Sequence, residues 1–221
     1  MAGKSLLLDI DGVLIRDKLL LAHVKDNCTK YVASKLPECK DPRETNRVLY
    51  LAHGHTARGL QKSFNVNTSD FNQQVYDKSV MDHLAEVIYS SDFQDEAKQI
   101  HEIAQRGWNV TLFTNSPIEW AGPIARAISD ELYIKCAGPD LTNTHLKPEA
   151  KFYNDFSKSH THIFVDDSPK NLGTARWLPN WHPVLFTDAP KDPKMWCPQV
   201  DSFWEMCMYI NSVEQWIQDT V

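Results

Sequence analysis

The sequence of 221 residues contains no long run of apolar residues. Uninterrupted runs such as those at residues 6–8 and 19–22 are far shorter than the roughly 18–20 residues needed to cross a membrane. The apolar stretch near the N-terminus stops at Asp9 and Asp11, whereas a secretory signal needs about 7–15 apolar residues in a row. We therefore expect no membrane association, no cleaved signal and a cytoplasmic location.

Cysteine and basic charge are also scarce. The five cysteines are widely spaced and include no Cys-x-x-Cys pair, which indicates reduced thiols, with neither a disulfide framework nor a zinc site. The 23 basic residues are outnumbered by 29 acidic ones, which gives a net charge of −6. This balance argues against binding to polymeric nucleic acid. A small anionic substrate is still possible if a metal or a local cluster of cations offsets the overall charge.

Apolar runs that end in small polar or acidic residues predict the buried strands. Three such runs cover residues 5–13, 109–113 and 162–165, and a fourth covers 184–186. Helical patterns lie around them, at residues 95–105, 118–128, 151–156 and 171–177. This alternation predicts an α/β fold with a doubly wound parallel sheet and a ligand site at the carboxyl ends of the strands. The tryptophans between residues 177 and 216 are expected mostly in the core, with an oligomer interface as the alternative.

The stretch from residue 17 to residue 92 differs from the rest of the chain. It has few strand-like runs, and its amphipathic segments lie near residues 20–36, 46–64 and 70–88. We interpret residues 17–92 as an inserted, all-helical domain. The α/β core is then expected to comprise residues 1–16 and 93–221.

Two aspartates at the end of the first predicted strand are the clearest chemical signal. Asp9 and Asp11 are two residues apart, so their side chains leave the same face of the strand and can share one site. Alone, an Asp-x-Asp-Gly pattern is more often an ordinary turn, but three further segments carry complementary groups. These are Asp166 and Asp167 after a second strand, Thr114 and Asn115 after a third, and Lys147 in a Lys-Pro loop. Together the four segments predict one site.

These residue types predict phosphoryl transfer assisted by a metal ion. A hard cation such as Mg²⁺ prefers carboxylate oxygens. The candidate ligands are Asp9, Asp11, Asp166 and Asp167, with Asp11 the least suited to bind through its side chain. The free oxygen of Asp9 can attack phosphorus and form an aspartyl-phosphate. Asp11 can protonate the leaving oxygen and later activate water.

Three residues are candidate phosphate-binding groups: Thr114, Asn115 and Lys147. The hydroxyl of Thr114 and nearby backbone N–H groups are suited to hold phosphoryl oxygens, and Asn115 belongs to the same segment. Lys147 contributes a positive charge for the transferring group and restrains the acidic cluster. The predicted site therefore balances several carboxylates with one lysine and a cation.

The four segments resemble the four motifs of the haloacid dehalogenase (HAD) superfamily of phosphatases. They read Asp-Ile-Asp-Gly-Val at 9–13, Leu-Phe-Thr-Asn-Ser at 112–116, Leu-Lys-Pro at 146–148 and Val-Asp-Asp-Ser at 165–168. The helical insertion resembles the cap of the subclass that carries it between motifs one and two. This resemblance covers nearly the whole chain and implies a Mg²⁺-dependent aspartyl-phosphate mechanism. It also implies that Asp167 binds the metal directly and Asp166 through water.

A finer resemblance concerns residues 49–60, which are similar to a cap segment of pyrimidine 5′-nucleotidases. His53 and His55 stand where a tyrosine and an apolar residue are more usual. The resemblance implies a substrate lid, in which Arg58, Tyr50 and His53 are the candidate substrate-binding residues. The alternative interpretation is a helix–turn–helix whose glycines simply make the turn.

The sequence thus favours a phosphomonoesterase that acts on a small phosphorylated metabolite, most simply a nucleoside 5′-monophosphate. One alternative is a phosphatase of a sugar phosphate or phosphoglycolate. Another is a catalytically idle protein that binds a phosphorylated ligand. Dehalogenation is less favoured, because the acid/base group Asp11 is useful for a phosphate ester and unnecessary for a carbon–halogen bond. A monomer or a homodimer is expected.

Overall fold

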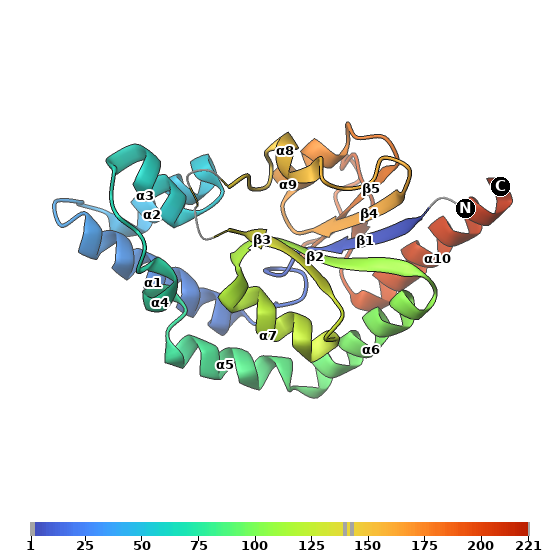
Figure 1. The fold of residues 1–221 in the computed structure, drawn as a ribbon, viewed down its shortest axis with the longest axis horizontal. Coiled ribbons are helices and arrows are strands. Elements are labelled where there is room, and N and C mark those ends of the chain that lie inside the picture. The colour runs from blue at the N-terminus through green and yellow to red at the C-terminus, as the bar shows by residue number, and fades with distance from the viewer. Residues whose placement is uncertain (1–2, 139–140, 142–143, 221) are drawn as a thin grey trace.

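A six-stranded, all-parallel sheet forms the centre of the protein (Figure 1). The computed structural model describes residues 3–138, 141 and 144–220. The strand order is β3–β2–β1–β4–β5–β6. The strands are β1 (Lys4–Leu8), β2 (Trp108–Pro117), β3 (Tyr133–Ala137), β4 (Thr161–Asp166), β5 (Trp181–Phe186) and β6 (Gln199–Val200). This arrangement confirms the predicted α/β class.

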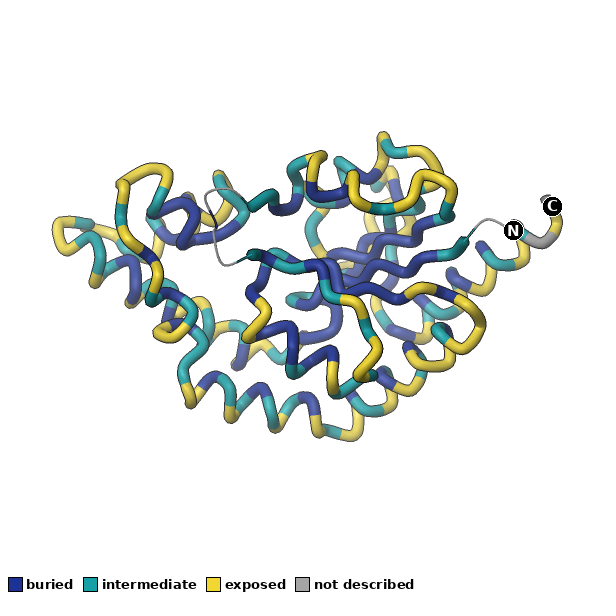
Figure 2. Tube along the Cα trace, viewed as in Figure 1, coloured by how far each residue is buried: buried dark blue, intermediate teal, exposed yellow. Residues whose placement is uncertain are grey.

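Helices cover both faces of the sheet. On one face lie α6 (Ser91–Gln105), α7 (Ile118–Ile128) and α10 (Phe203–Thr220), and on the other lie α8 (Ala150–Tyr153) and α9 (Pro169–Ala175) (Figure 1). The side chains of the central strand β1 pack against the helices on both sides of the sheet, because successive side chains point to opposite faces. Leu6 and Leu8 pack into the hydrophobic cluster under α6, α7 and α10, whereas Leu7 packs with Phe113 and Phe164 on the other side. The tube in Figure 2 shows the strands as the most deeply buried part of the chain.

The pairing register brings three strand ends to one edge of the sheet. Leu8 lies opposite Leu112 on β2 and opposite Val165 on β4. The residues that follow these three positions therefore lie side by side. Asp9, Phe113 and Asp166 come next in the chain, so the register carries the predicted catalytic segments to one place.

Six helices lie between β1 and β2; the last of them, α6, covers the sheet, and five others precede it in the chain. These five are α1 (Lys18–Lys35), α2 (Pro42–His53), α3 (Thr56–Phe64), α4 (Phe71–Val75) and α5 (Lys78–Ile88). Helices α1 to α4 share a hydrophobic cluster with members such as Tyr31, Leu49 and Phe71, and Leu146 of the core joins it. Helix α5, in contrast, contributes buried residues to the main cluster under the sheet. From here on the name cap means residues 17–76, which contain α1 to α4; the division into an inserted domain of residues 17–92 and a core stays a prediction.

Helix-capping residues explain where the first helices of the cap region begin and end. Asp17 Oδ1 accepts a hydrogen bond from Leu20 N at 2.7 Å and starts α1, and Asp41 caps α2 in the same way. Gly54 ends α2 with a φ of 75°, a left-handed conformation that favours glycine. His55 then starts α3. The short link between α2 and α3 is thus fixed by a glycine and a histidine.

The C-terminal aromatic residues correct one expectation. Helix α10 buries Phe203, Met206, Ile210 and Val213 at helical spacing against the sheet layer. Trp204 and Trp216 lie on its outer face and are 68% and 56% exposed, and Trp177 at the end of α9 is 80% exposed. The expectation that these tryptophans fill the core was wrong, because smaller apolar residues already occupy the inner face.

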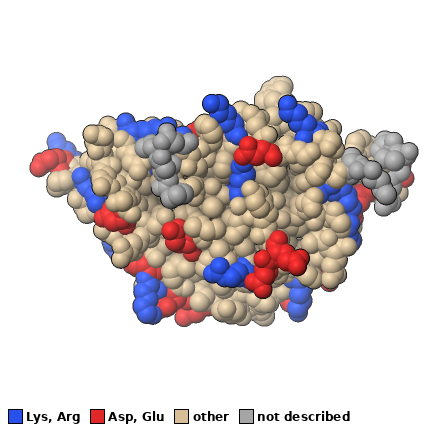
Figure 3. Space-filling view, viewed as in Figure 1, with Lys and Arg blue, Asp and Glu red and all other residues tan. Residues whose placement is uncertain are grey.

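The surface agrees with the charge balance of the sequence. On the face shown in Figure 3, the Lys and Arg side chains are interspersed with acidic ones and form no continuous basic area among the residues described. Within the same part of the chain, no helix combines the length and the apolar character that crossing a lipid bilayer requires.

Candidate active site

The candidate site lies at the edge of the sheet where β1, β2 and β4 end. Asp9 directly follows β1, and its backbone N–H donates to the carbonyl of Val165 at 2.9 Å. Gly12, which directly follows Asp11, has a φ of +83°. A Cβ atom there would lie 2.3 Å from Oδ2 of Asp167, so both the conformation and the space require glycine. The first loop therefore closes tightly over the second pair of carboxylates.

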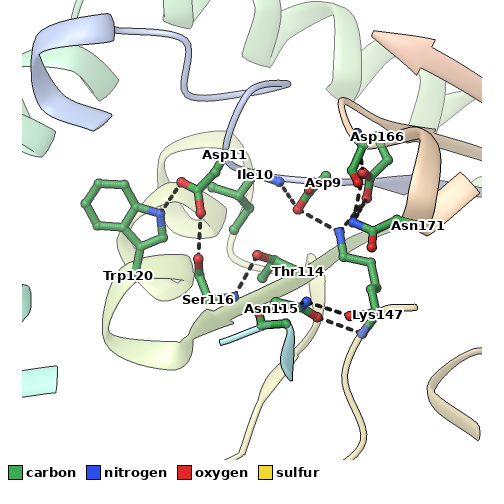
Figure 4. Close-up of polar contacts among 12 residues, drawn as sticks. Asp9, Ile10, Asp11, Thr114, Asn115, Ser116, Trp120, Lys147, Asp166 and Asn171 are labelled. Atoms are coloured by element: carbon green, nitrogen blue, oxygen red, sulfur yellow. Dashed lines mark hydrogen bonds and ion pairs between the residues drawn. The ribbon is translucent and has the colours of Figure 1, made fainter. Parts of the chain in front are cut away.

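The ammonium group of Lys147 lies between Asp9 and Asp166 (Figure 4). Its Nζ lies 2.8 Å from Asp9 Oδ1 and 2.7 Å from Asp166 Oδ2, and the side chain is 1% exposed. The ammonium also lies over the rings of Phe113 and Phe164, at 5.4 and 5.6 Å from their centroids. Burial alone would lower the pKa of Lys147, but the two carboxylates outweigh it and raise the pKa. The lysine is therefore held as a fixed positive charge.

Three carboxylates beside Lys147 form a set of candidate oxygen ligands for a metal ion. One oxygen each of Asp9, Asp166 and Asp167 lies within 4.8 Å of the others. Burial raises the pKa of Asp9 despite the opposing effect of Lys147, and in Asp167 burial and the charge of Asp166 raise the pKa to about 7. Such crowding of negative charge is relieved by a cation, and an all-oxygen set suits a hard divalent ion. The residues present therefore fit a divalent metal.

The two motif-four carboxylates have different surroundings. Asp166 is fully buried, and it accepts hydrogen bonds from Ser168 N, from the amide of Asn171 and from Lys147. Its oxygens are therefore largely committed to protein groups. Asp167 is exposed toward the cavity. The more open carboxylate is Asp167, in keeping with the order of metal ligands that the resemblance implies.

Asp11 is separated from this cluster and held by two donors on the opposite side (Figure 4). Ser116 Oγ donates to Asp11 Oδ2 at 2.6 Å, and Trp120 Nε1 donates to Oδ1 at 2.9 Å. Burial raises the pKa of Asp11, and the two hydrogen bonds oppose the rise only in part. A carboxyl group with a raised pKa and a fixed orientation is suited to act as a general acid. Neither Ser116 nor Trp120 was predicted from the sequence.

If Trp120 positions Asp11, then Trp120→Phe is expected to lower kcat by about 10-fold with little change in KM, because one hydrogen bond to the candidate general acid is lost. Steady-state kinetics on a phosphomonoester would measure this. Trp108→Phe is a matched control, since Trp108 Nε1 donates to Glu214, far from the site. Equal kcat values for both variants would show that Trp120 has no positioning role.

The motif-two residues have different surroundings from each other. Thr114 is 1% exposed, lines the cavity and accepts a hydrogen bond from Ser116 N at 3.0 Å through its hydroxyl. The amide of Asn115 is fully used: Nδ2 donates to the carbonyls of Gly54 and Lys147, at 3.2 and 2.9 Å, and Oδ1 accepts from Lys147 N at 2.8 Å. Asn115 therefore has no free side-chain donor for phosphate. Its side chain instead ties the cap to the lysine loop.

A cavity of about 360 Å³ opens between the cap and the core. Its end at the edge of the sheet includes Asp9, Asp11 and Asp167. The cap side is mainly apolar or aromatic and is lined by Leu21, Val24, Cys28, Tyr50, His55 and Phe71, with Tyr76 and Trp120 beside them. The volume is in the range of small-molecule sites.

The structure brings only one of the three predicted cap residues to this cavity. Tyr50 lines it and is 54% exposed. His53 is outside the lining, where its Nε2 lies 3.1 Å from Ser63 Oγ. Arg58 is also outside the lining; it is 4% exposed and forms an ion pair with Glu149 in the loop after Lys147. Arg58 thus connects the cap to the core.

Solved structures match nearly the whole chain. The HAD phosphatase from Thermococcus onnurineus has a TM-score of 0.58 and 14% identity, over 94% of this chain and 97% of that one. This protein has the haloacid dehalogenase fold. In sequence comparisons, no family model and no curated protein match the chain.

Two further HAD structures match at similar levels. A predicted phosphoglycolate phosphatase from Haemophilus somnus has a TM-score of 0.52 and 15% identity, over 95% of this chain and 99% of that one. A proposed HAD hydrolase, YfnB from Bacillus subtilis, was solved bound to magnesium and has a TM-score of 0.50 and 13% identity, over 96% of this chain and 100% of that one. At such identities the HAD fold alone is established, because one fold supports many reactions.

Proposed function

We propose that this protein is a metal-dependent phosphomonoesterase that acts through an aspartyl-phosphate on Asp9, with a nucleoside 5′-monophosphate as its substrate. The observation that carries the proposal is the arrangement of two aspartates around one cavity. Asp9 is beside Lys147 and the metal-ligand carboxylates, whereas Asp11 is held apart by Ser116 and Trp120. A nucleophile and an acid are thereby separated, as the hydrolysis of a phosphate ester requires.

In the first step, Asp9 attacks the phosphorus of the substrate. Ile10 N and Lys147 Nζ both engage Asp9 Oδ1, which leaves Oδ2 as the oxygen free to attack. The bond from Oδ2 to phosphorus forms while the bond from phosphorus to the ester oxygen breaks. Asp11 gives its proton to that leaving oxygen, which departs as an alcohol. Lys147 and the hydroxyl of Thr114 stabilise the negative charge on the phosphoryl oxygens.

In the second step, water attacks the phosphorus of the aspartyl-phosphate. Asp11 is now a carboxylate and takes a proton from the water. The bond between phosphorus and Asp9 Oδ2 breaks, which restores both the Asp9 carboxylate and the free acid Asp11 and releases inorganic phosphate. A divalent cation bound by Asp9, Asp166 and Asp167 would neutralise charge on these carboxylates and on the phosphoryl group.

Metal binding is expected to raise the melting temperature more near about pH 8 than near about pH 5. Without metal, Asp167 has a pKa of about 7 in the folded chain against 3.8 as the reference value. Between these values the folded chain holds a proton that the unfolded chain has lost, so the free energy of unfolding falls as the pH rises. A cation must displace that proton at low pH but not at high pH.

Thermal melts with Mg²⁺ and with EDTA at the two pH values measure this difference. Asp167→Asn is the matched variant, because it removes the titrating carboxyl group while preserving the shape of the side chain. It should largely lose the pH dependence of the Mg²⁺ effect. Stabilisation by Mg²⁺ that is equal at both pH values in the unaltered protein would contradict the ligand role of Asp167.

The cavity supports a nucleotide as the substrate. A flat base fits a wall that includes Phe71, Tyr76 and Trp120, because aromatic rings stack on heteroaromatic ones. The rings of Tyr76 and Trp120 already pack together, with centroids 5.3 Å apart. This wall continues from the side of the site where Trp120 holds Asp11, which is where the leaving group departs. The base is therefore expected on the cap side of Asp11.

A smaller, doubly anionic substrate is the second candidate. Lys25 and Arg47 also line the cavity, and either could meet a carboxylate such as that of phosphoglycolate. Arg47, however, already forms two hydrogen bonds to Glu44 on its own helix. The aromatic wall would have no partner in so small a substrate, so we favour the nucleotide.

Phosphate release from a panel of substrates tests the proposal. The panel contains nucleoside monophosphates, sugar phosphates and phosphoglycolate, each with Mg²⁺ and with EDTA. The proposal predicts release that depends on Mg²⁺ and favours nucleotides. Release from sugar phosphates or phosphoglycolate alone would be consistent with the proposed mechanism but would refute a nucleoside monophosphate as the substrate. No release from any substrate would favour a catalytically idle binding protein.

A further inference from the structure

His55 sits at the junction between the cap and the catalytic edge. It follows Gly54, whose carbonyl accepts the hydrogen bond from Asn115. A Cβ atom at Gly54 would lie 2.9 Å from the carbonyl oxygen of Lys147, so this part of the cap is packed directly on the lysine loop. His55 is among the residues that line the cavity, yet it is only 7% exposed. Its ring is therefore fixed in the wall beside the catalytic groups.

The hydrogen bonding of His55 determines where its proton lies. Ala57 N donates to Nδ1 at 3.2 Å as the N-terminal cap of α3, so Nδ1 is an acceptor and carries no hydrogen. Burial, and then the nearby charge of Arg58, lowers the pKa of His55 to about 4. The imidazole is therefore neutral at physiological pH, with its single proton on Nε2.

The Nε2–H group of His55 has no acceptor within the described part of the chain. The buried side-chain nitrogens and oxygens that lack a partner there are Arg58 Nε, Gln61 Oε1 and His162 Nδ1. Nε2 of His55 is not one of these enclosed atoms, so it keeps some exposed surface, and the residue lines the cavity. An unpaired N–H group in a largely apolar wall costs free energy, and a ligand that supplies a hydrogen-bond acceptor removes this cost.

The surroundings of His55 indicate what kind of ligand this is. The ring of Phe71 packs against the imidazole, with centroids 5.1 Å apart, and Phe71 lines the same cavity. A neutral donor beside an aromatic face matches a neutral oxygen on a flat ring better than it matches a second phosphate. A carbonyl oxygen of a nucleobase has this chemistry.

We propose that His55 selects the substrate by donating from Nε2–H to a carbonyl oxygen of the nucleobase. This inference rests on the proposed nucleotide substrate and assigns the base contact to His55. The predicted cap residues Arg58 and His53 do not make that contact, because neither lines the cavity. His55 is a specificity residue and takes no part in breaking the ester bond.

The test compares UMP with ribose 5-phosphate, which lacks the base, in the unaltered protein and in His55→Asn. Asparagine can still cap α3 through its side-chain oxygen, but it is too short to place a donor where Nε2 lies. We expect kcat/KM for UMP to fall by about 10-fold and that for ribose 5-phosphate to change by less than about 2-fold. His53→Asn is the matched control and should leave both values unchanged.

The ratio of the two kcat/KM values does not depend on how much of the variant is folded. It therefore tests the contact between His55 and the base even if His55→Asn is less stable. An unchanged ratio in His55→Asn would overturn the inference while leaving the nucleotidase in place. An unaltered protein that hydrolyses ribose 5-phosphate as well as UMP would also overturn it. If neither compound is hydrolysed, the proposed function fails. The affinities for UMP and ribose 5-phosphate, measured by calorimetry, then test the base contact, because His55→Asn should lower the ratio of the first affinity to the second.

Discussion

Replacing Asp9 by asparagine is expected to reduce phosphate release by at least about 1,000-fold. The amide cannot act as the attacking oxygen, so the aspartyl-phosphate does not form. Its oxygen can still accept the hydrogen bonds that Ile10 N and Lys147 make to Asp9, and Lys147 keeps its ion pair with Asp166. The fold should therefore survive. Release of inorganic phosphate and far-UV circular dichroism measure the two parts of this prediction.

Asp155→Asn is the matched control for Asp9→Asn. Asp155 is likewise a carboxylate paired with a lysine, Lys135, but it is mostly exposed and lies outside the active-site cavity. Its replacement should leave the rate of phosphate release unchanged. Near-normal release by Asp9→Asn would refute the assignment of Asp9 as the nucleophile, whatever the substrate.

The second large effect is expected for Lys147→Met, which should lower the free energy of unfolding by about 3–5 kcal/mol in the absence of metal. The substitution removes the cation between Asp9 and Asp166 and leaves their carboxylates buried without a counter-charge. Activity should be lost as well, because no fixed positive charge remains beside the phosphoryl group. Urea denaturation in EDTA measures the stability.

Lys135→Met provides the comparison for this loss. Lys135 is also buried, yet its partner Asp155 is 76% exposed and stays hydrated when the lysine is removed. We expect a change of no more than about 1 kcal/mol from the loss of that ion pair. Equal destabilisation by the two substitutions would mean that Lys147 stabilises the fold through its apolar stem and that its charge contributes little.

The α/β class and the position of the motifs could be predicted from the sequence because a polar or acidic residue marks the end of each apolar run. Apolar runs stop at Asp9, at Thr114 and at Asp166, and parallel pairing then places these ends together. Strand β3 was missed because Lys135 interrupts its apolar run. The structure accommodates this lysine at the edge of the sheet, with its ammonium over the rings of Phe152 and Phe156.

The supporting contacts of the site could not be predicted, because they depend on tertiary geometry. Ser116 and Trp120 reach Asp11 from more than 100 positions away in the sequence. In the cap, a pattern of residue types placed Arg58 and His53 at the substrate, whereas the fold turns them away and leaves His55 in the cavity wall. Helix α10, by contrast, was predictable in principle from the spacing of Phe203, Met206 and Ile210.

Transfer of the phosphoryl group to Asp9 is the central claim, and trapping the intermediate tests it most directly. The protein would be mixed with Mg²⁺ and UMP, quenched in acid, digested, and its peptides weighed by mass spectrometry. We predict that the peptide containing Asp9 gains the mass of one phosphoryl group, and that the same peptide of Asp9→Asn gains nothing. Turnover of UMP with no phosphoryl group on that peptide, or with the group on another residue, would contradict the mechanism.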